Sequence, residues 1–267
     1  MSTSGPNRQR VLVTGGGTLL GDAVAAALLA EGADVTLLMR PGAENRLGAL
    51  GLRVREVSAD VWEPSSLKGH ARGMSAVIHT VGGMTADPAH GLSFSYLNIV
   101  SARNVANMAV NGGAARMVLL SAVAAPWAPR GYVRAKREAE QYLERIGLRA
   151  TIIRAPVVFV RGSKRRLFYR AFSALGNFPL TGWLGFRALA PLPLDVVARG
   201  IARITLAPRT EKLIYGAKDL RNHNSARELR RGMTGDGRTL GDAMLPASTI
   251  QLLDDEIPFG WTPRERY

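Results

Sequence analysis

Short runs of aliphatic and β-branched residues alternate with amphipathic stretches through the first half of the chain. The runs predict buried strands, and several of the stretches between them predict helices. The predicted strands cover residues 11–14, 34–39, 53–57, 76–80, 116–121 and 150–154. The predicted helices cover residues 20–30, 64–69, 95–111 and 131–146, the first with Gly32 beyond its end. This rhythm predicts an α/β fold, a doubly wound parallel sheet covered by helices on both faces.

The alternation weakens after about residue 160, where proline and glycine become frequent. A helix is still expected at 195–207 and a strand at 212–215. We therefore divide the chain into a first domain (1–160), a small C-terminal lobe on the substrate side that does not fold independently (161–235), and a tail (236–267). The pattern in the tail is thin, and we expect it to be poorly ordered.

A glycine-rich turn joins the first predicted strand to the first predicted helix. The sequence from Val11 to Gly21 reads VLVTGGGTLLG. Glycines allow the backbone to approach a pyrophosphate closely, and a helix N-terminus supplies N–H donors and a partial positive charge. The next predicted strand completes the strand–helix–strand unit that such a turn requires. We interpret the first domain as a Rossmann-type dinucleotide-binding domain; the alternative is a tight turn without a ligand.

The composition narrows the function classes. The 267 residues contain no cysteine, which excludes disulfides, a thiol nucleophile and Cys-ligated metal centres. The 35 Lys+Arg residues exceed the 21 Asp+Glu residues, and the excess is concentrated in residues 130–170, which hold 12 basic and 3 acidic side chains. We predict no metal site. No apolar run is long enough for a membrane-spanning helix, and the first ten residues do not resemble a signal peptide, so a cytoplasmic protein is expected.

The turn resembles the opening of the short-chain dehydrogenase/reductase superfamily, particularly its extended and atypical branches, which include epimerase/dehydratase-like proteins and a subunit of respiratory complex I. Those proteins begin with T-G-x-x-G-x-x-G. Thr14, Gly15 and Gly21 match this pattern, whereas Thr18 stands at the middle glycine, for which Gly17 is the candidate replacement. The resemblance covers about residues 11–205. The cofactor-binding residues it implies are Thr14, Gly15, Gly17, Thr18, Leu19, Leu20, Asp60, Val61, Thr80, Val81, Gly82, Lys136, Pro156 and Val157.

The nicotinamide cofactor is indicated by the end of the second predicted strand. An acidic residue there would accept hydrogen bonds from the adenosine ribose and select NAD. Arg40 instead offers a planar set of donors suited to a 2′-phosphate. We therefore predict NADP(H) rather than NAD(H), with a solvated arginine at a strand end as the alternative.

Tyr132 and Lys136 are four residues apart and share one face of a predicted helix. In the superfamily that the sequence resembles, the tyrosine and lysine of Y-x-x-x-K carry out the chemistry. The lysine holds the nicotinamide ribose. Together with the oxidised nicotinamide, the lysine also lowers the pKa of the tyrosine, which exchanges a proton. The resemblance also implies a proton-relay role for Asn98 and a substrate-binding role for Ser121. Many relatives place that hydroxyl one or two residues later. His79 is interpreted as structural rather than catalytic.

Basic residues and aromatic rings are mixed in residues 161–186, which contain six of the chain's 17 aromatic residues. The simplest reading is that the rings pack a small lobe while the arginines reach solvent. The alternative is contact with an anionic membrane surface on its inner face. Nucleic acid is not favoured, because no recognised nucleic-acid module is present.

Together these features predict an NADP(H)-dependent oxidoreductase that acts on a carbonyl or alcohol of a small apolar substrate, such as an isoprenoid, quinone-like or lipid molecule. The alternative is a non-catalytic protein that keeps the nucleotide as a structural or sensing ligand. The resemblance also implies a homodimer built from helices like those at 95–111 and 131–146.

Overall fold

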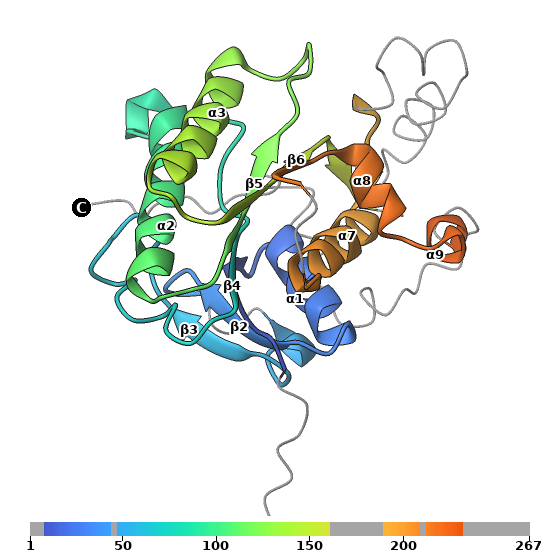
Figure 1. Cartoon of the computed structure of the whole chain (residues 1–267). Coiled ribbons are helices and arrows are strands. Elements are labelled where there is room, and N and C mark those ends of the chain that lie inside the picture. Colours follow the sequence, from blue (N-terminus) through green and yellow to red (C-terminus); the bar gives the residue numbers. More distant parts are fainter. Residues whose placement is uncertain (1–7, 44–46, 161–188, 209–211, 232–267) are drawn as a thin grey trace, which may run out of the picture.

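A parallel sheet forms the centre of the molecule. The structure, a computed structural model, describes residues 8–43, 47–160, 189–208 and 212–231 (Figure 1). Within these ranges seven parallel strands are arranged in the order β3-β2-β1-β4-β5-β6-β9, and β7 pairs separately with β8. The strands are β1 (Arg10–Gly16), β2 (Asp34–Met39), β3 (Arg55–Ser58), β4 (Ala76–His79), β5 (Met117–Ala122), β6 (Ala150–Ala155), β7 (Val158–Phe159), β8 (Leu192–Pro193) and β9 (Ile214–Tyr215).

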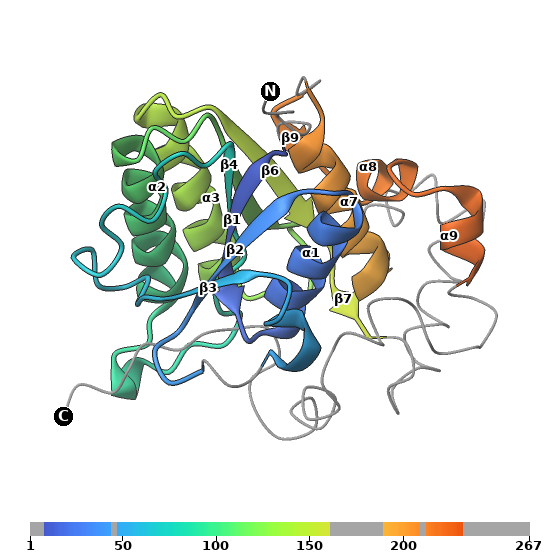
Figure 2. The same cartoon turned by 90° about the horizontal axis from the view of Figure 1, so that it is seen from below.

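Helices cover both faces of this sheet. The α-helices of the described ranges are α1 (Leu19–Ala30), α2 (Ser101–Asn111), α3 (Arg130–Arg145), α7 (Leu194–Leu206), α8 (Ala217–Asn222) and α9 (Ala226–Arg231). Figures 1 and 2 show α1 and α7 on one face and α2 and α3 on the other. A π-helical turn, Tyr96–Val100, leads directly into α2. The predicted Rossmann-type doubly wound fold is confirmed.

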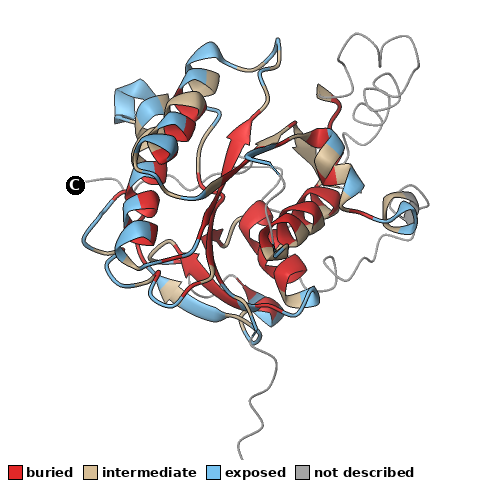
Figure 3. Ribbon diagram, viewed as in Figure 1, coloured by how far each residue is buried: buried red, intermediate tan, exposed pale blue. Residues whose placement is uncertain are grey.

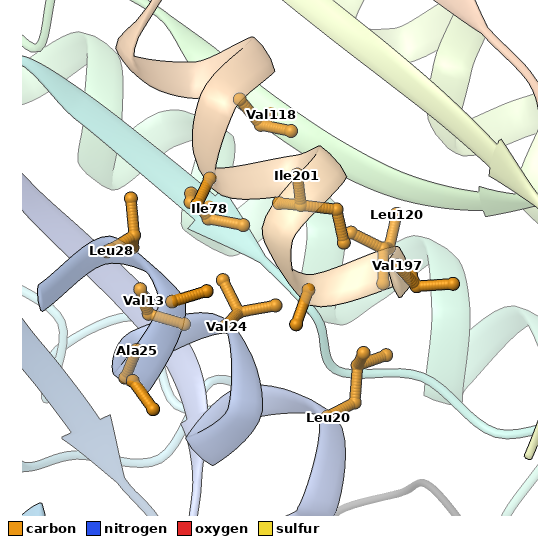
Figure 4. Packing of buried hydrophobic residues seen from close by; sticks show 14 of the residues in the cluster. Val13, Leu20, Val24, Ala25, Leu28, Ile78, Val118, Leu120, Val197 and Ile201 are labelled. Carbon is orange, nitrogen blue, oxygen red and sulfur yellow. The ribbon is translucent and has the colours of Figure 1, made fainter. Parts of the chain in front are cut away.

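Two hydrophobic cores, one on each side of the sheet, explain the continuous apolar runs. Successive residues of β1 alternate between them: Val11 and Val13 face α1 and α7, whereas Leu12 faces the core under α2 and α3. Buried positions follow the strands and the inner faces of the helices (Figure 3). Figure 4 shows the first core, in which side chains of α1 and α7 meet over the sheet. Each fully buried aliphatic side chain stabilises such a core by about 1.5–3 kcal/mol.

One predicted helix is absent. Residues 64–69 form a series of turns closed by bonds from an N–H to the carbonyl three residues earlier, as from Leu67 to Pro64 and from Lys68 to Ser65. Gly69, at the end of the segment, adopts a left-handed conformation (φ +87°). The other predicted helices and strands are present, with ends that differ by one or two residues.

The segment after residue 188 returns to the sheet. Helix α7 packs against α1, and β9 pairs with β6 at the edge of the sheet. The predicted helix at 195–207 and strand at 212–215 are thus confirmed as α7 and β9. Residues 161–188, which include the basic and aromatic segment, and the tail 236–267 lie outside the described residues, so the expectations for them stay predictions.

The strand order creates one position at which the chain changes direction. From β1 the chain proceeds outward to β2 and β3, whereas from β4 it proceeds the opposite way to β5 and β6. The carboxyl ends of β1 and β4 are therefore adjacent, and ligands of doubly wound sheets bind at this switch point. None of the helices in the described ranges has the length and apolar character needed to cross a bilayer.

Candidate active site

The glycine turn lies at the carboxyl end of β1. Gly15 and Gly17 have left-handed backbones, with φ of +93° and +78°. A Cβ at Gly21 would lie 2.1 Å from the carbonyl oxygen of Gly15, and a Cβ at Gly15 would lie 2.2 Å from Thr80 Oγ1. These glycines are therefore required where strand and helix approach each other, as the predicted pyrophosphate-binding turn demands.

Thr18 serves as the N-cap of α1. Its hydroxyl donates to the carbonyl of Gly15 (2.7 Å) and accepts from the N–H of Gly21 (3.2 Å). Capping by threonine stabilises a helix by about 1 kcal/mol. Thr18 thus replaces the middle glycine of the expected pattern with a residue that fixes the start of the helix.

Two backbone donors remain at this helix start. The N–H groups of Leu19 and Leu20 have no hydrogen-bond partner within the described ranges. The helix dipole adds a partial positive charge at the same point. The turn and these two donors fit a dinucleotide pyrophosphate. The predicted cofactor-binding roles of Leu19 and Leu20 require such donors.

Asp22, in the first turn of α1, is a buried carboxyl group that the sequence reasoning missed. It accepts a hydrogen bond from the N–H of Gly17 (2.8 Å) and is only 1% exposed. Burial raises the pKa of Asp22 to about 7, although the bond from Gly17 opposes the shift. An acidic residue directly after the glycine turn was visible in the sequence, but its burial was not.

The predicted adenosine-binding residues follow β2 and β3. Arg40 is half-buried directly after β2, and the turn after it closes with a bond from the N–H of Ala43 to its carbonyl (3.0 Å). Asp60 accepts a hydrogen bond from the N–H of Trp62 (2.9 Å). Val61 is buried, and its carbonyl accepts a bond from Asn104 Nδ2 (3.0 Å). All of these residues lie at the carboxyl end of the sheet, as the prediction requires.

The segment after β4 connects the glycine turn to the second half of the site. The Thr80 hydroxyl donates to the carbonyl of Thr14 (2.5 Å), and His79 Nδ1 bonds with the Thr14 hydroxyl (2.9 Å). Burial and the nearby Lys136 ammonium lower the pKa of His79 to about 3, so its ring is neutral. His79 is enclosed by the core, which agrees with a structural role.

Gly82 brings Asn98 and Lys136 together. A Cβ at Gly82 would lie 2.5 Å from Asn98 Oδ1 and 2.6 Å from Lys136 Nζ. The π-helical turn positions Asn98, whose Nδ2 donates to the carbonyls of Gly83 (2.9 Å) and Phe94 (3.0 Å). Its Oδ1 is buried and has no partner in the described part of the chain. A buried acceptor without a partner is costly and indicates a place for a ligand or a water molecule.

Tyr132 and Lys136 lie on the inner side of α3, with the Lys136 nitrogen 5.9 Å from the centre of the Tyr132 ring. The ammonium donates to the carbonyl of Leu120 (3.1 Å). Burial lowers the pKa of Lys136 to about 8, only partly opposed by the charge of Glu140. Phe94 packs against Tyr132, with ring centres 6.4 Å apart. The structure therefore brings together three of the four predicted catalytic residues.

The protonation of Tyr132 is governed by its burial. Burial raises the pKa of Tyr132 to about 12, and the positive charge of Arg137 offsets only a part of this. Desolvation outweighs the charges around the phenol, and Lys136 is not among the causes of this shift. The expected lowering depends on the oxidised nicotinamide as well as on the lysine and stays a prediction. Tyr132 is consequently a neutral proton donor at neutral pH.

Ser121 belongs to a polar cluster beside the site. Its hydroxyl donates to Glu140 Oε1 (2.5 Å) and accepts from Arg137 Nη1 (3.1 Å). Arg154 binds the other oxygen of Glu140 (2.6 Å). Burial alone would raise the pKa of Glu140, but hydrogen bonds from Arg154 and Ser121 and the charges of both arginines hold it below its ordinary value.

This cluster ties α3 to the ends of β5 and β6, and the substrate-binding role of Ser121 stays a prediction. Glu140 follows Lys136 by one helical turn, a spacing that could have been used to find it. The predicted nicotinamide-side residues follow β6: Pro156 is buried, and the carbonyl of Val157 accepts a bond from the N–H of Leu192 (2.9 Å).

Comparison with known proteins identifies the family and supports the fold. The family described as NAD(P)H-binding matches residues 15–167. A search of curated proteins finds no match. A short-chain dehydrogenase/reductase superfamily protein from Agrobacterium tumefaciens with bound NAD is 18% identical, with a TM-score of 0.55, 76% of this chain and 75% of that chain being covered.

Two further structures share the fold. UDP-glucose 4-epimerase from Bifidobacterium longum, in complex with NAD+ and UDP, is 16% identical, with a TM-score of 0.57 and coverage of 78% of this chain and 77% of that chain. A short-chain dehydrogenase/reductase from Veillonella parvula in complex with NADP is 14% identical, with a TM-score of 0.54 and coverage of 77% and 90%. The chain thus belongs to the NAD(P)H-binding family and has the fold of the short-chain dehydrogenase/reductase superfamily.

Proposed function

We propose that the protein is an NADP(H)-dependent oxidoreductase that interconverts a carbonyl and an alcohol. The observation that carries the proposal is the convergence of Asn98 and Lys136 on Gly82, with the Lys136 nitrogen 5.9 Å from the centre of the Tyr132 ring. When bound, the nicotinamide supplies or accepts the hydride. In the reducing direction, the hydride is added to the carbonyl carbon while Tyr132 donates its phenolic proton to the carbonyl oxygen.

The other residues prepare this transfer. Lys136, whose ammonium donates to the carbonyl of Leu120, would bind the nicotinamide ribose and stabilise the phenolate left on Tyr132. The unpartnered Oδ1 of Asn98 can accept a hydrogen bond from a water molecule that returns a proton to the site. The burial of this group excludes bulk water and strengthens each electrostatic interaction.

The proposed substrate is small and apolar. The ring of Phe94 packs against the ring of Tyr132. Gly131 allows this contact, because a Cβ there would lie 2.7 Å from the Phe94 ring. The aromatic residues in the sequence of segment 168–186 also favour an apolar substrate. Turnover of NADPH with a panel of apolar aldehydes, ketones and quinones tests the proposal.

A second candidate function is a non-catalytic dinucleotide-binding scaffold or sensor. It is favoured by the hydroxyl of Ser121, whose proton and one lone pair are used by Glu140 and Arg137. Ala122 and Val123 offer no hydroxyl in its place. NADPH binding without turnover of any substrate, in the wild type and in Tyr132→Phe alike, would support this candidate over the enzyme.

Arg40 carries the proposed preference for NADP(H). Changing Arg40 to Asp should remove a donor for the 2′-phosphate and introduce an acceptor for the ribose hydroxyls, so we expect the preference to reverse toward NADH. Titrations of both proteins with NADPH and NADH, followed by nicotinamide fluorescence, measure the ratio of the two affinities. Arg53→Asp, on the loop before β3, is the matched control for the charge change. An unchanged ratio in Arg40→Asp would contradict the assignment.

A further inference from the structure

Asp22 is an acid in an unusual place. A pyrophosphate-binding turn works by presenting N–H donors and positive potential to an anion, and a carboxylate in its midst opposes both. Asp22 Oδ1 lies 2.8 Å from the N–H of Gly17, which it occupies, and the side chain is enclosed in the protein. The N–H groups of Leu20 and Leu19, which have no partner among the described residues, lie two and three residues before Asp22 in the sequence.

We propose that Asp22 sets the affinity for the dinucleotide through its protonation, the protein with neutral Asp22 binding the dinucleotide more tightly than the protein with the Asp22 carboxylate. This inference rests on dinucleotide binding at the glycine turn and goes beyond it. The carboxylate would repel the pyrophosphate through the turn, whereas the neutral acid would not. Binding therefore takes up a proton.

Among the described residues, the charged groups around Asp22 do not compensate its charge. The described elements that pack against α1 are β1, β2 and α7. At the same end of these elements lie Arg40, after β2, and Asp195, which is paired with Arg199 (2.7 Å). The other charged residues of these elements lie at the opposite end, away from Asp22: Arg10, Asp34, Arg203 and, on α1 itself, Glu31. Burial raises the pKa of Asp22 and the bond from the Gly17 N–H lowers it, and neither influence is a charged side chain.

The consequence is a pH dependence near neutrality. Because the pKa of Asp22 is raised to about 7 in the folded protein, the group loses its proton as the pH rises through 7, and affinity is expected to fall over that range. The same shift makes the folded state bind a proton that the unfolded chain has released. The free energy of unfolding contributed by Asp22 is therefore highest below about pH 4 and declines as the pH rises toward 7.

The experiment measures NADH affinity between pH 6.5 and 8.5 by fluorescence titration. NADH is the probe because it lacks the 2′-phosphate, which itself titrates near pH 6. We expect the Kd of the wild type to rise at least about fivefold over this range and that of Asp22→Asn to change by less than about twofold. Asp34→Asn, which alters an exposed acid at the other end of β2, should keep the wild-type slope.

Calorimetry in buffers of different ionisation enthalpy supplies a second readout. The wild type should take up protons on binding NADH at pH 7.5, and Asp22→Asn should take up none. Asp22→Ser replaces Asp22→Asn if the latter fails to fold, as judged by thermal melting. Equal slopes in wild type and variant would overturn the role of Asp22 alone, whereas no binding of NADH or NADPH by any of these proteins would overturn the proposed function as well.

Discussion

Replacing Tyr132 with phenylalanine is expected to lower turnover of NADPH with a carbonyl substrate by at least about 100-fold, because general acid catalysis typically contributes 10²–10⁴-fold. The affinity for NADPH should change little, since the ring still packs against Phe94 and leaves Lys136 in place. Steady-state rates together with fluorescence titration separate the two effects. The loss should appear in kcat rather than in the Kd of the dinucleotide.

Tyr142→Phe is the matched control, because Tyr142 lies on the same helix but donates its hydroxyl to Asn107 away from the site (2.7 Å). It should retain wild-type turnover. If Tyr132→Phe turned over substrate as fast as the wild type, Tyr132 would not be the proton donor and the assignment of the reaction would be wrong.

Replacing Gly21 with alanine is expected to destabilise the protein by about 3 kcal/mol and to abolish dinucleotide binding. The new Cβ would lie 2.1 Å from the carbonyl oxygen of Gly15, a backbone atom that cannot move without separating β1 from α1. Overpacking of this kind typically costs 1–3 kcal/mol, and here it also distorts the pyrophosphate-binding turn. Denaturant unfolding and NADPH titration measure the two effects.

Gly32→Ala provides the comparison at the other end of α1. Gly32 has a left-handed backbone (φ +84°) but nothing within 4 Å of its Cβ position. We expect a cost of about 1–2 kcal/mol from backbone strain alone, with NADPH binding preserved. Equal stability of Gly21→Ala and the wild type would contradict the close approach of strand and helix.

The sequence was sufficient to predict the sheet, because the strands are buried on both faces and therefore read as uninterrupted apolar runs. The glycine turn was predictable for a related reason: Gly15 and Gly21 stand where a side chain has no space. Residues 64–69 misled, because so short a segment does not show from its sequence whether it forms a helix or the successive turns that the chain has there.

The site was predictable in its membership but not in its electrostatics. Spacing alone placed Tyr132 and Lys136 on one helical face, and the structure adds Asn98 through Gly82. The protonation of Tyr132 depends on burial, which spacing does not report, and for this reason its pKa is raised and not lowered. Glu140, on α3, was missed because its partners lie elsewhere in the sequence, Ser121 on β5 and Arg154 on β6.

The structure of the protein crystallised with NADP+ tests the account most directly. It should place pyrophosphate oxygens within hydrogen-bond distance of the Leu19 and Leu20 N–H groups, the nicotinamide ribose at Lys136, and the nicotinamide ring beside the Tyr132 hydroxyl. Dinucleotide bound elsewhere on the protein, or bound at the glycine turn with its nicotinamide directed away from Tyr132, would contradict the account.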